Sequence, residues 1–267
     1  MQRQQWTSKI GVVLAVAGSA VGLGNFLRFP SIATQNGGGA FLIPYFTAFL
    51  LLGIPLCWVE WSMGRYGGRF SHGSAPGILD AVAHRRRPEA KYLGAIGILG
   101  PLLIFFYYIF IESWTLGYAF YSLTGKLTSL KQQEEMVAFL GGYNGTQPND
   151  FFPSLVPAYI FFLITFFLNL GILYLGIAKG IEVVSKIAMP LLVILGVILM
   201  VRVLTLGTPH PEQPDWNVNN GLGFMWNPDF SKLSDARVWL AAAGQVFFTL
   251  SVGIGVILTY ASYLRSR

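Results

Sequence analysis

The sequence predicts an all-α, polytopic membrane protein with six transmembrane helices, the first and the sixth of which are interrupted. Its composition is one reason, because 54% of the residues are hydrophobic and 11% are charged, whereas soluble domains average about 25% charged residues. The long apolar stretches are another, since a membrane helix needs about 20 apolar residues. Six stretches meet this length, and we expect helices near residues 11–34, 39–63, 92–123, 154–174, 183–206 and 237–263.

The basic residues predict a multi-pass protein of the cell membrane whose N-terminus and C-terminus are cytoplasmic. With this orientation, twelve basic residues lie on the inner side: Arg3, Lys9, Arg65, Arg69, Arg85, Arg86, Arg87, Lys91, Lys179, Lys186, Arg265 and Arg267. Five lie on the outer side: Lys126, Lys131, Arg202, Lys232 and Arg237. This asymmetry follows the positive-inside rule. The net charge of +6 is therefore explained by the topology of the chain in the lipid bilayer. No nucleic-acid partner is expected.

The first predicted helix contains a run of small residues from Gly18 to Gly24, followed by Asn25 and Arg28. Backbone groups that an interruption exposes inside a membrane must bind an ion, a ligand or water. Gly18 and Gly22 also have the spacing with which membrane helices pack closely, and this interpretation stays open. The amide of Asn25 and the carbonyls of a broken helix would supply the oxygen ligands that Na⁺ requires.

The sixth predicted helix repeats this pattern between Gly244 and Gly255, where it combines an amide, two hydroxyls and paired glycines. The hydroxyls belong to Thr249 and Ser251. Such hydroxyls often donate to carbonyls of their own helix, which is the alternative interpretation. Two interrupted helices five spans apart are typical of transporters built from inverted repeats. Together the two segments predict a binding site at mid-membrane depth.

Several motifs are spread along the chain. They are Trp6, Gly18-x-x-x-Gly22-Leu23-Gly24-Asn25-Phe26-x-Arg28-Phe29-Pro30, Asn36-Gly37-Gly38-Gly39-Ala40-Phe41, Glu60-x-x-x-Gly64-Arg65-Tyr66, Tyr107-Tyr108 and Glu112-Ser113-Trp114. From about residue 3 to residue 264 the chain resembles the N-terminal half of the neurotransmitter:sodium symporter family, closest to its bacterial leucine-transporter members. The resemblance implies the first half of a 5+5 inverted-repeat fold. It also implies sodium-coupled symport of a small, hydrophobic amino acid by alternating access.

The resemblance implies three sets of site residues around the interrupted helices. Two sodium ions would be bound by Gly18, Ala20, Val21, Asn25 and Thr249. The amino-acid substrate would be bound by Ser19, Ala20, Leu23, Gly24, Ile104, Tyr108, Phe248, Thr249, Ser251 and Ile254. The gates on either side would be formed by Arg3, Trp6, Arg28, Gln245, Ser262 and Tyr263, with the rings of Tyr108 and Phe248 beside Arg28.

Gly22 and Ile254 imply the class of substrate. In the family that this chain resembles, members that carry monoamines differ at the position of Gly22, where they have an Asp that replaces the carboxylate that monoamines lack. Gly22 therefore implies a substrate with its own carboxylate, which would lie on the amides of Leu23 and Gly24 and on the hydroxyl of Tyr108. The leucine-transporter members have a bulkier aromatic residue at the position of Ile254, so the resemblance implies a wider pocket in this chain. Burial of apolar surface there, worth roughly 25 cal/mol per Å², favours an apolar side chain.

Two acidic residues lie within predicted helices. Intramembrane charges are functional hypotheses by default. One interpretation of Glu60 is that it accepts hydrogen bonds from backbone amides of the interrupted sixth helix. For Glu112 the simpler interpretation is that it points into an outer aqueous vestibule.

The family has twice as many helices, so two functional classes stay open. The first is a symporter represented by an incomplete, single transmembrane domain, residues 1–267, that is inactive by itself. The alternative is a truncated, non-transporting membrane protein that acts as a binding or interaction module. An enzyme is not expected, because the three histidines form no metal or triad pattern. A chloride requirement and a homodimer of the full-length protein are both left open.

Overall fold

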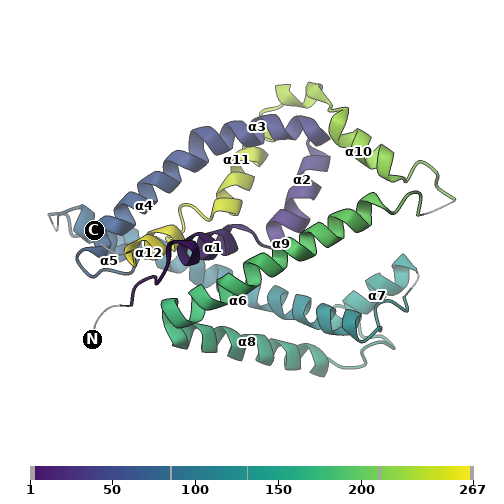
Figure 1. The fold of residues 1–267 in the computed structure, drawn as a ribbon, viewed down its shortest axis with the longest axis horizontal. Helices are drawn as coiled ribbons and strands as arrows, with labels where there is room; N and C mark the ends of the chain where they lie inside the picture. Colours follow the sequence, from purple (N-terminus) through teal and green to yellow (C-terminus); the bar gives the residue numbers. More distant parts are fainter. Residues whose placement is uncertain (1–3, 85, 131, 210–211, 265–267) are drawn as a thin grey trace. The chain divides into compact units, whose positions relative to one another are not determined.

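Figure 1 shows the computed structural model, which describes residues 4–84, 86–130, 132–209 and 212–264. Within these residues the regular structure is helical, apart from one isolated bridge between Asn149 and Phe152. The prediction of an all-α chain is therefore confirmed for the described residues. The chain forms two compact units, of which one comprises Met1–Ile98 and Ile177–Arg267 and the other Leu99–Gly176.

The first unit contains most of the helices, where α marks an α-helix and η a short π-helix or 3-10 helix. In chain order they are α1 (Lys9–Ala20), η1 (Gly24–Arg28), α2 (Phe29–Gln35), η2 (Gly38–Phe41), α3 (Leu42–Ala48), η3 (Phe49–Gly53), α4 (Ile54–Gly68), α5 (Ala75–Val82), η4 (Ile177–Ile181), α9 (Glu182–Leu204), α10 (Val218–Trp226), η5 (Phe230–Ser234), α11 (Ala236–Leu250) and α12 (Val256–Ser262). The second unit contains α7 (Gln133–Asn144) and α8 (Val156–Gly176). The long helix α6 (Glu89–Leu123) runs through the boundary between the units.

The sequence explains where α1 and α11 begin. The hydroxyl of Ser8 accepts a hydrogen bond from the N–H of Gly11 at 3.0 Å. In the same way the carboxylate of Asp235 accepts one from the N–H of Arg237 at 2.8 Å. The first N–H groups of a helix have no partner within the helix, and a side-chain cap of this kind satisfies one of them.

The lengths of the helices support a membrane protein. In the described part of the chain, three helical runs are long and apolar enough to cross a bilayer: Gly38–Gly68, Glu89–Leu123 and Val156–Leu204. A fourth is present if Lys9–Ala20 and Gly24–Gln35, which are bent by 49° at their junction, form one span. A shorter apolar helix, α11, has 15 residues. These lengths are compatible with a multi-pass arrangement, and the division into six spans stays a prediction.

Close packing in the first unit depends on glycines. A Cβ atom on Gly64 of α4 would lie 2.7 Å from the Cβ of Ala261 in α12, and one on Gly68 would meet the carbonyl of Ser262. A Cβ on Gly18 of α1 would lie 3.3 Å from the sulfur of Met189 in α9. Small residues allow membrane helices to approach each other in this way. Gly18 therefore faces α9, and the packing interpretation of its spacing from Gly22 stays a prediction.

An aromatic cluster organises the second unit. Phe139 and Tyr143 of α7 are fully buried together with Phe152, and the Tyr143 hydroxyl donates to the carbonyl of Ser113 at 3.4 Å. Burial raises the pKa of the Tyr143 phenol above its ordinary value. The amine of Lys126 lies 4.6 Å from the centroid of the Phe152 ring, a cation–π contact. Residues 124–153, which connect the third and fourth predicted helices and which we call the outer loop, are therefore a folded element with its own core.

Candidate functional site

The first helix is broken between Ala20 and Gly24. The N–H of Val21 donates to the carbonyl of Ala17 at 2.7 Å, and the backbone of Val21 is then extended, with φ −97° and ψ 99°. The carbonyls that follow Ala17 lie beyond this last helical hydrogen bond. Because the final carbonyls of a helix have no partner within it, the end of α1 presents backbone oxygens at the break.

A second break separates α11 from α12. Ser251 has the left-handed conformation, with φ 54° and ψ 32°, which is uncommon for a residue other than glycine. Gly253 and Gly255 follow with φ 83° each. The carboxylate of Glu60 in α4 accepts a hydrogen bond from the N–H of Gly253. The expected contact of Glu60 with the amides of this segment is therefore present.

Glu60 is nearly buried, and only one of its oxygens is engaged. The side chain is 9% exposed, and Oε2 has no hydrogen-bond partner among the described residues. Burying a polar group without a partner is unfavourable, while the bond from the Gly253 N–H satisfies a donor that the break would otherwise leave unpaired. One helix thus supplies the side chain that compensates for an interruption in another.

The two broken helices meet at Phe248. A Cβ atom on Gly24 would collide with the Phe248 ring, so any larger residue there would require this ring to move. The guanidinium of Arg28 lies 4.7 Å from the centroid of the same ring. A nitrogen of Arg28 also donates to Oε1 of Gln245, whose Nε2 in turn lies 3.3 Å from the hydroxyl of Thr249. These contacts link the segment after the first break to the segment before the second.

The N-terminal segment is attached to the helix after the second break. The indole N–H of Trp6 donates to the carbonyl of Tyr260 at 2.9 Å, and its backbone N–H donates to the carbonyl of Tyr263 at 3.3 Å. The rings of Trp6 and Tyr260 pack edge to face at 5.5 Å. Trp6 is 4% exposed and Ser262 is 3% exposed. These two bonds and the burial of Trp6 attach the N-terminal segment to the end of α12.

The structure places the predicted site residues unequally. It brings Arg28 of η1 together with Gln245 and Phe248 of α11, and it brings Trp6 together with Tyr263 at the end of α12. The half-buried predicted ligands at the breaks are Ser19, Ala20, Val21, Leu23, Asn25, Thr249, Ser251 and Ile254. Ile104 and Tyr108 lie in α6 within the second unit, so their expected contact with the breaks stays a prediction. Arg3 lies outside the described residues.

A polar cluster around Glu182 was not predicted from the sequence. Glu182 is fully buried, and its oxygens accept bonds from the N–H of Thr7 and the hydroxyl of Ser8, each at 2.8 Å, and from the hydroxyl of Thr7. Lys186 donates to it at 2.7 Å, one turn along α9. The spacing of Glu182 and Lys186 was a usable signal for the ion pair. No sequence pattern connected them to residues 7 and 8.

The comparisons with known proteins agree with this geometry. The model of the sodium:neurotransmitter symporter family matches residues 3–138 and 158–267. An uncharacterized sodium-dependent transporter of Methanocaldococcus jannaschii, MJ1319, is 34% identical over 100% of this chain and 50% of its own length. The uncharacterized sodium-dependent transporter YhdH of Bacillus subtilis is 34% identical over 97% of this chain and 52% of its own length.

A solved structure gives a similar result. The crystal structure of MhsT in complex with L-phenylalanine is 36% identical to this chain, with a TM-score of 0.80 over 99% of this chain and 55% of MhsT. The chain spans about half the length of the curated relatives it matches. Since the family model covers nearly all of its residues, the chain belongs to the sodium:neurotransmitter symporter family.

Proposed function

We propose that this chain contributes the two interrupted helices of a sodium-coupled symporter for a hydrophobic amino acid. The observation that carries the proposal is the pair of breaks, at Val21–Leu23 and Ser251–Gly255, joined through Arg28 and Phe248. Unsatisfied backbone at membrane depth occurs where protein encloses it or where it lines a cavity. Residues 1–267 then form one transmembrane domain of six spans, with the N-terminus in the cytoplasm and the breaks within the first and sixth spans.

We place two sodium ions at the first break. We assign one ion to the carbonyl of Ala20 and the side chains of Asn25 and Thr249, and a second ion to the carbonyls of Gly18 and Val21. Support comes from the end of α1, where the carbonyls after Ala17 lie beyond the last helical bond. Oxygen ligands of this kind suit a hard cation, and broken helices of transporters typically supply them.

The amino acid would bind next to the sodium ions. We assign its carboxylate to the amides of Leu23 and Gly24, where the N-terminal end of η1 offers N–H donors and a favourable dipole. Phe248 borders this position, because its ring lies against the backbone of Gly24. The further assigned contacts are Ser19, Ala20, Ile104, Tyr108, Thr249, Ser251 and Ile254. The complex of MhsT with L-phenylalanine supports a hydrophobic amino acid as substrate.

Alternating access would depend on the contacts on either side of the breaks. On the predicted outer side, Arg28 binds Gln245 and lies over Phe248. On the predicted inner side, Trp6 binds the carbonyls of Tyr260 and Tyr263. Breaking one set while the other is kept would open the site to one side of the membrane at a time.

The test compares two threonines of the full-length protein. Thr249→Val removes the assigned sodium ligand, whereas Thr47→Val removes a hydroxyl that only donates to the carbonyl of Ile43 in its own helix, at 2.8 Å. We expect Thr249→Val to weaken sodium-dependent binding of labelled L-phenylalanine at least about tenfold, the cost of roughly 1.4 kcal/mol. Thr47→Val should bind as the parent does.

The measurement is equilibrium binding in sodium buffer and in an otherwise equal N-methylglucamine buffer, followed by uptake into vesicles across a sodium gradient. Binding that is equal in both buffers would contradict sodium coupling. Sodium-dependent binding without uptake would favour the alternative, a non-transporting binding module.

A further inference from the structure

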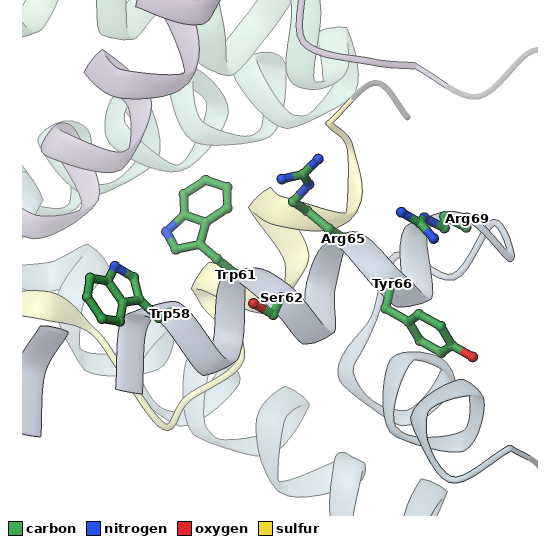
Figure 2. Close-up of a pocket in the computed structure, with 6 residues that line it drawn as sticks. All are labelled: Trp58, Trp61, Ser62, Arg65, Tyr66 and Arg69. Carbon is green, nitrogen blue, oxygen red and sulfur yellow. The ribbon is translucent and has the colours of Figure 1, made fainter. Parts of the chain in front are cut away.

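One surface on α4 is separate from the breaks and has no part in the proposed transport. Six side chains near the end of this helix line a hollow of about 420 Å³: Trp58, Trp61, Ser62, Arg65, Tyr66 and Arg69 (Figure 2). We refer to them as the α4 hollow. The two arginines lie at the C-terminal end of α4, where Arg65 is in the last turn and Arg69 is the capping residue.

The arginines of the α4 hollow are available for an anionic ligand. Both are exposed, and residues four apart on a helix face the same side. Within the described residues the ion pair that the structure forms joins Lys186 to Glu182, so neither arginine is neutralised by a described carboxylate. The nearest acidic residue along the helix, Glu60, is buried and accepts its bond from Gly253.

The aromatic residues place the α4 hollow at a membrane surface. Trp58 is 69% exposed, and exposed tryptophan and tyrosine side chains are typical of the interface between a bilayer and water. Arg65 lies seven residues after Trp58, and this spacing puts both on one side of α4. The exposed Leu50, Leu51 and Leu52 of η3 precede them in the same helical run, Gly38–Gly68. Leu51 is also 69% exposed. An apolar stripe therefore leads from the arginines toward the centre of the membrane.

We propose that the α4 hollow binds the headgroup of an anionic phospholipid of the cytoplasmic leaflet. Guanidinium groups bind phosphate oxygens through paired N–H donors, and the hydroxyl of Ser62 and the indoles of Trp58 and Trp61 add polar contacts around the same space. The exposed leucine stripe accommodates the acyl chains. A phospholipid matches both features, whereas a soluble phosphate matches only the arginines. The negative charge of the cytoplasmic leaflet attracts basic residues at this level.

The position of the arginines at a helix end has a simpler cause, which the experiment must separate from lipid binding. Cations near the C-terminus of a helix interact favourably with its dipole. That effect stabilises α4 in any lipid and predicts no difference between headgroups. Selectivity for one headgroup is therefore the decisive property.

The test measures lipid binding to the full-length protein by native mass spectrometry, with phosphatidylglycerol and phosphatidylcholine of equal chain length. Arg65→Gln with Arg69→Gln removes two charges from the α4 hollow. Arg86→Gln with Arg87→Gln is the matched control, since it removes two exposed charges from the same predicted side outside the hollow. We expect the first pair to weaken phosphatidylglycerol binding about 30-fold, because each surface arginine contributes roughly a factor of five. The control should change it less than about threefold.

Two further measurements keep the proposal testable if the glutamine variant folds poorly. Arg65→Lys with Arg69→Lys keeps both charges but loses the paired donors, and we expect an intermediate affinity at an unchanged melting temperature. Inorganic phosphate at millimolar concentration should not displace phosphatidylglycerol. Equal affinity for the two lipids, equal loss in the control pair, or displacement by phosphate alone would each overturn the proposal.

Discussion

The two breaks differ in how their backbone groups are satisfied. At the second break, Ser251, Gly253 and Gly255 turn the chain through left-handed conformations, and Glu60 from α4 accepts the N–H of Gly253. At the first break, Val21 is extended after its bond to Ala17. No side chain of the described residues caps the N-terminal end of η1. The second break is thus partly satisfied by the protein itself, while the first is the one to which we assign most of the bound ligands. Mutations should accordingly affect stability at one break and ligand binding at the other.

The largest expected effect is at the first break. Gly22→Asp places a carboxylate where we assign the carboxylate of the amino acid, and like charges in a site of low dielectric cost several kcal/mol. We expect binding of labelled L-phenylalanine to fall more than about 100-fold, which corresponds to roughly 2.7 kcal/mol.

Gly22→Asn is the matched control for this change, because it has nearly the same size without the charge. We expect it to retain more binding than Gly22→Asp in the same assay. If the two variants bound equally, size rather than charge would explain the loss. If Gly22→Asp bound as the parent does, the carboxylate would not lie at this position.

An intermediate effect is expected at the second break, on stability. Glu60→Ala removes the acceptor of the Gly253 N–H from a half-buried hydrogen bond, and a hydrogen bond to a charged group contributes about 1.5–3 kcal/mol. Glu60→Gln keeps an acceptor oxygen and should remain within about 1 kcal/mol of the parent. The measurement is the free energy of unfolding in detergent micelles. Equal stability of the alanine variant and the parent would show that the break needs no capping from α4.

The sequence predicts both breaks because their causes are local. The small residues after Ala17 weaken α1, and Gly253 and Gly255 can adopt left-handed conformations that other residues avoid. Glu60 was also predictable, since a charge within an apolar helix requires a partner. These features can be read along a single stretch of chain. The place at which the first helix breaks can therefore be predicted from the residues of that segment.

Contacts between distant parts of the chain could not be predicted in this way. The bonds of Thr7 and Ser8 to Glu182 join residues that are 175 and 174 positions apart. Thr7 and Ser8 are by themselves ordinary residues for the start of a helix. Only the packing of α1 against α9 shows that both hydroxyls donate to Glu182. The same holds for Phe139, Tyr143 and Phe152, whose burial depends on how the outer loop folds.

The smallest expected effect concerns the contacts that flank the breaks. Trp6→Phe removes the indole N–H that donates to the carbonyl of Tyr260 at 2.9 Å but keeps an aromatic ring against Tyr260. A neutral hydrogen bond contributes about 1 kcal/mol, so opening of the N-terminal segment should become about fivefold more frequent. Hydrogen exchange of the backbone amides at residues 260–263 measures this opening.

Trp239→Phe provides the control, because its indole N–H donates to the carbonyl of Leu233, also at 2.9 Å, near the start of α11. The same bond is lost there, but away from the N-terminal segment. Exchange at residues 260–263 should therefore stay at the parent rate. If both variants accelerated exchange equally, the effect would reflect general destabilisation. If neither did, Trp6 would hold the segment through the packing of its ring on Tyr260 and its backbone bond to Tyr263, and closure on this side would not depend on the indole hydrogen bond.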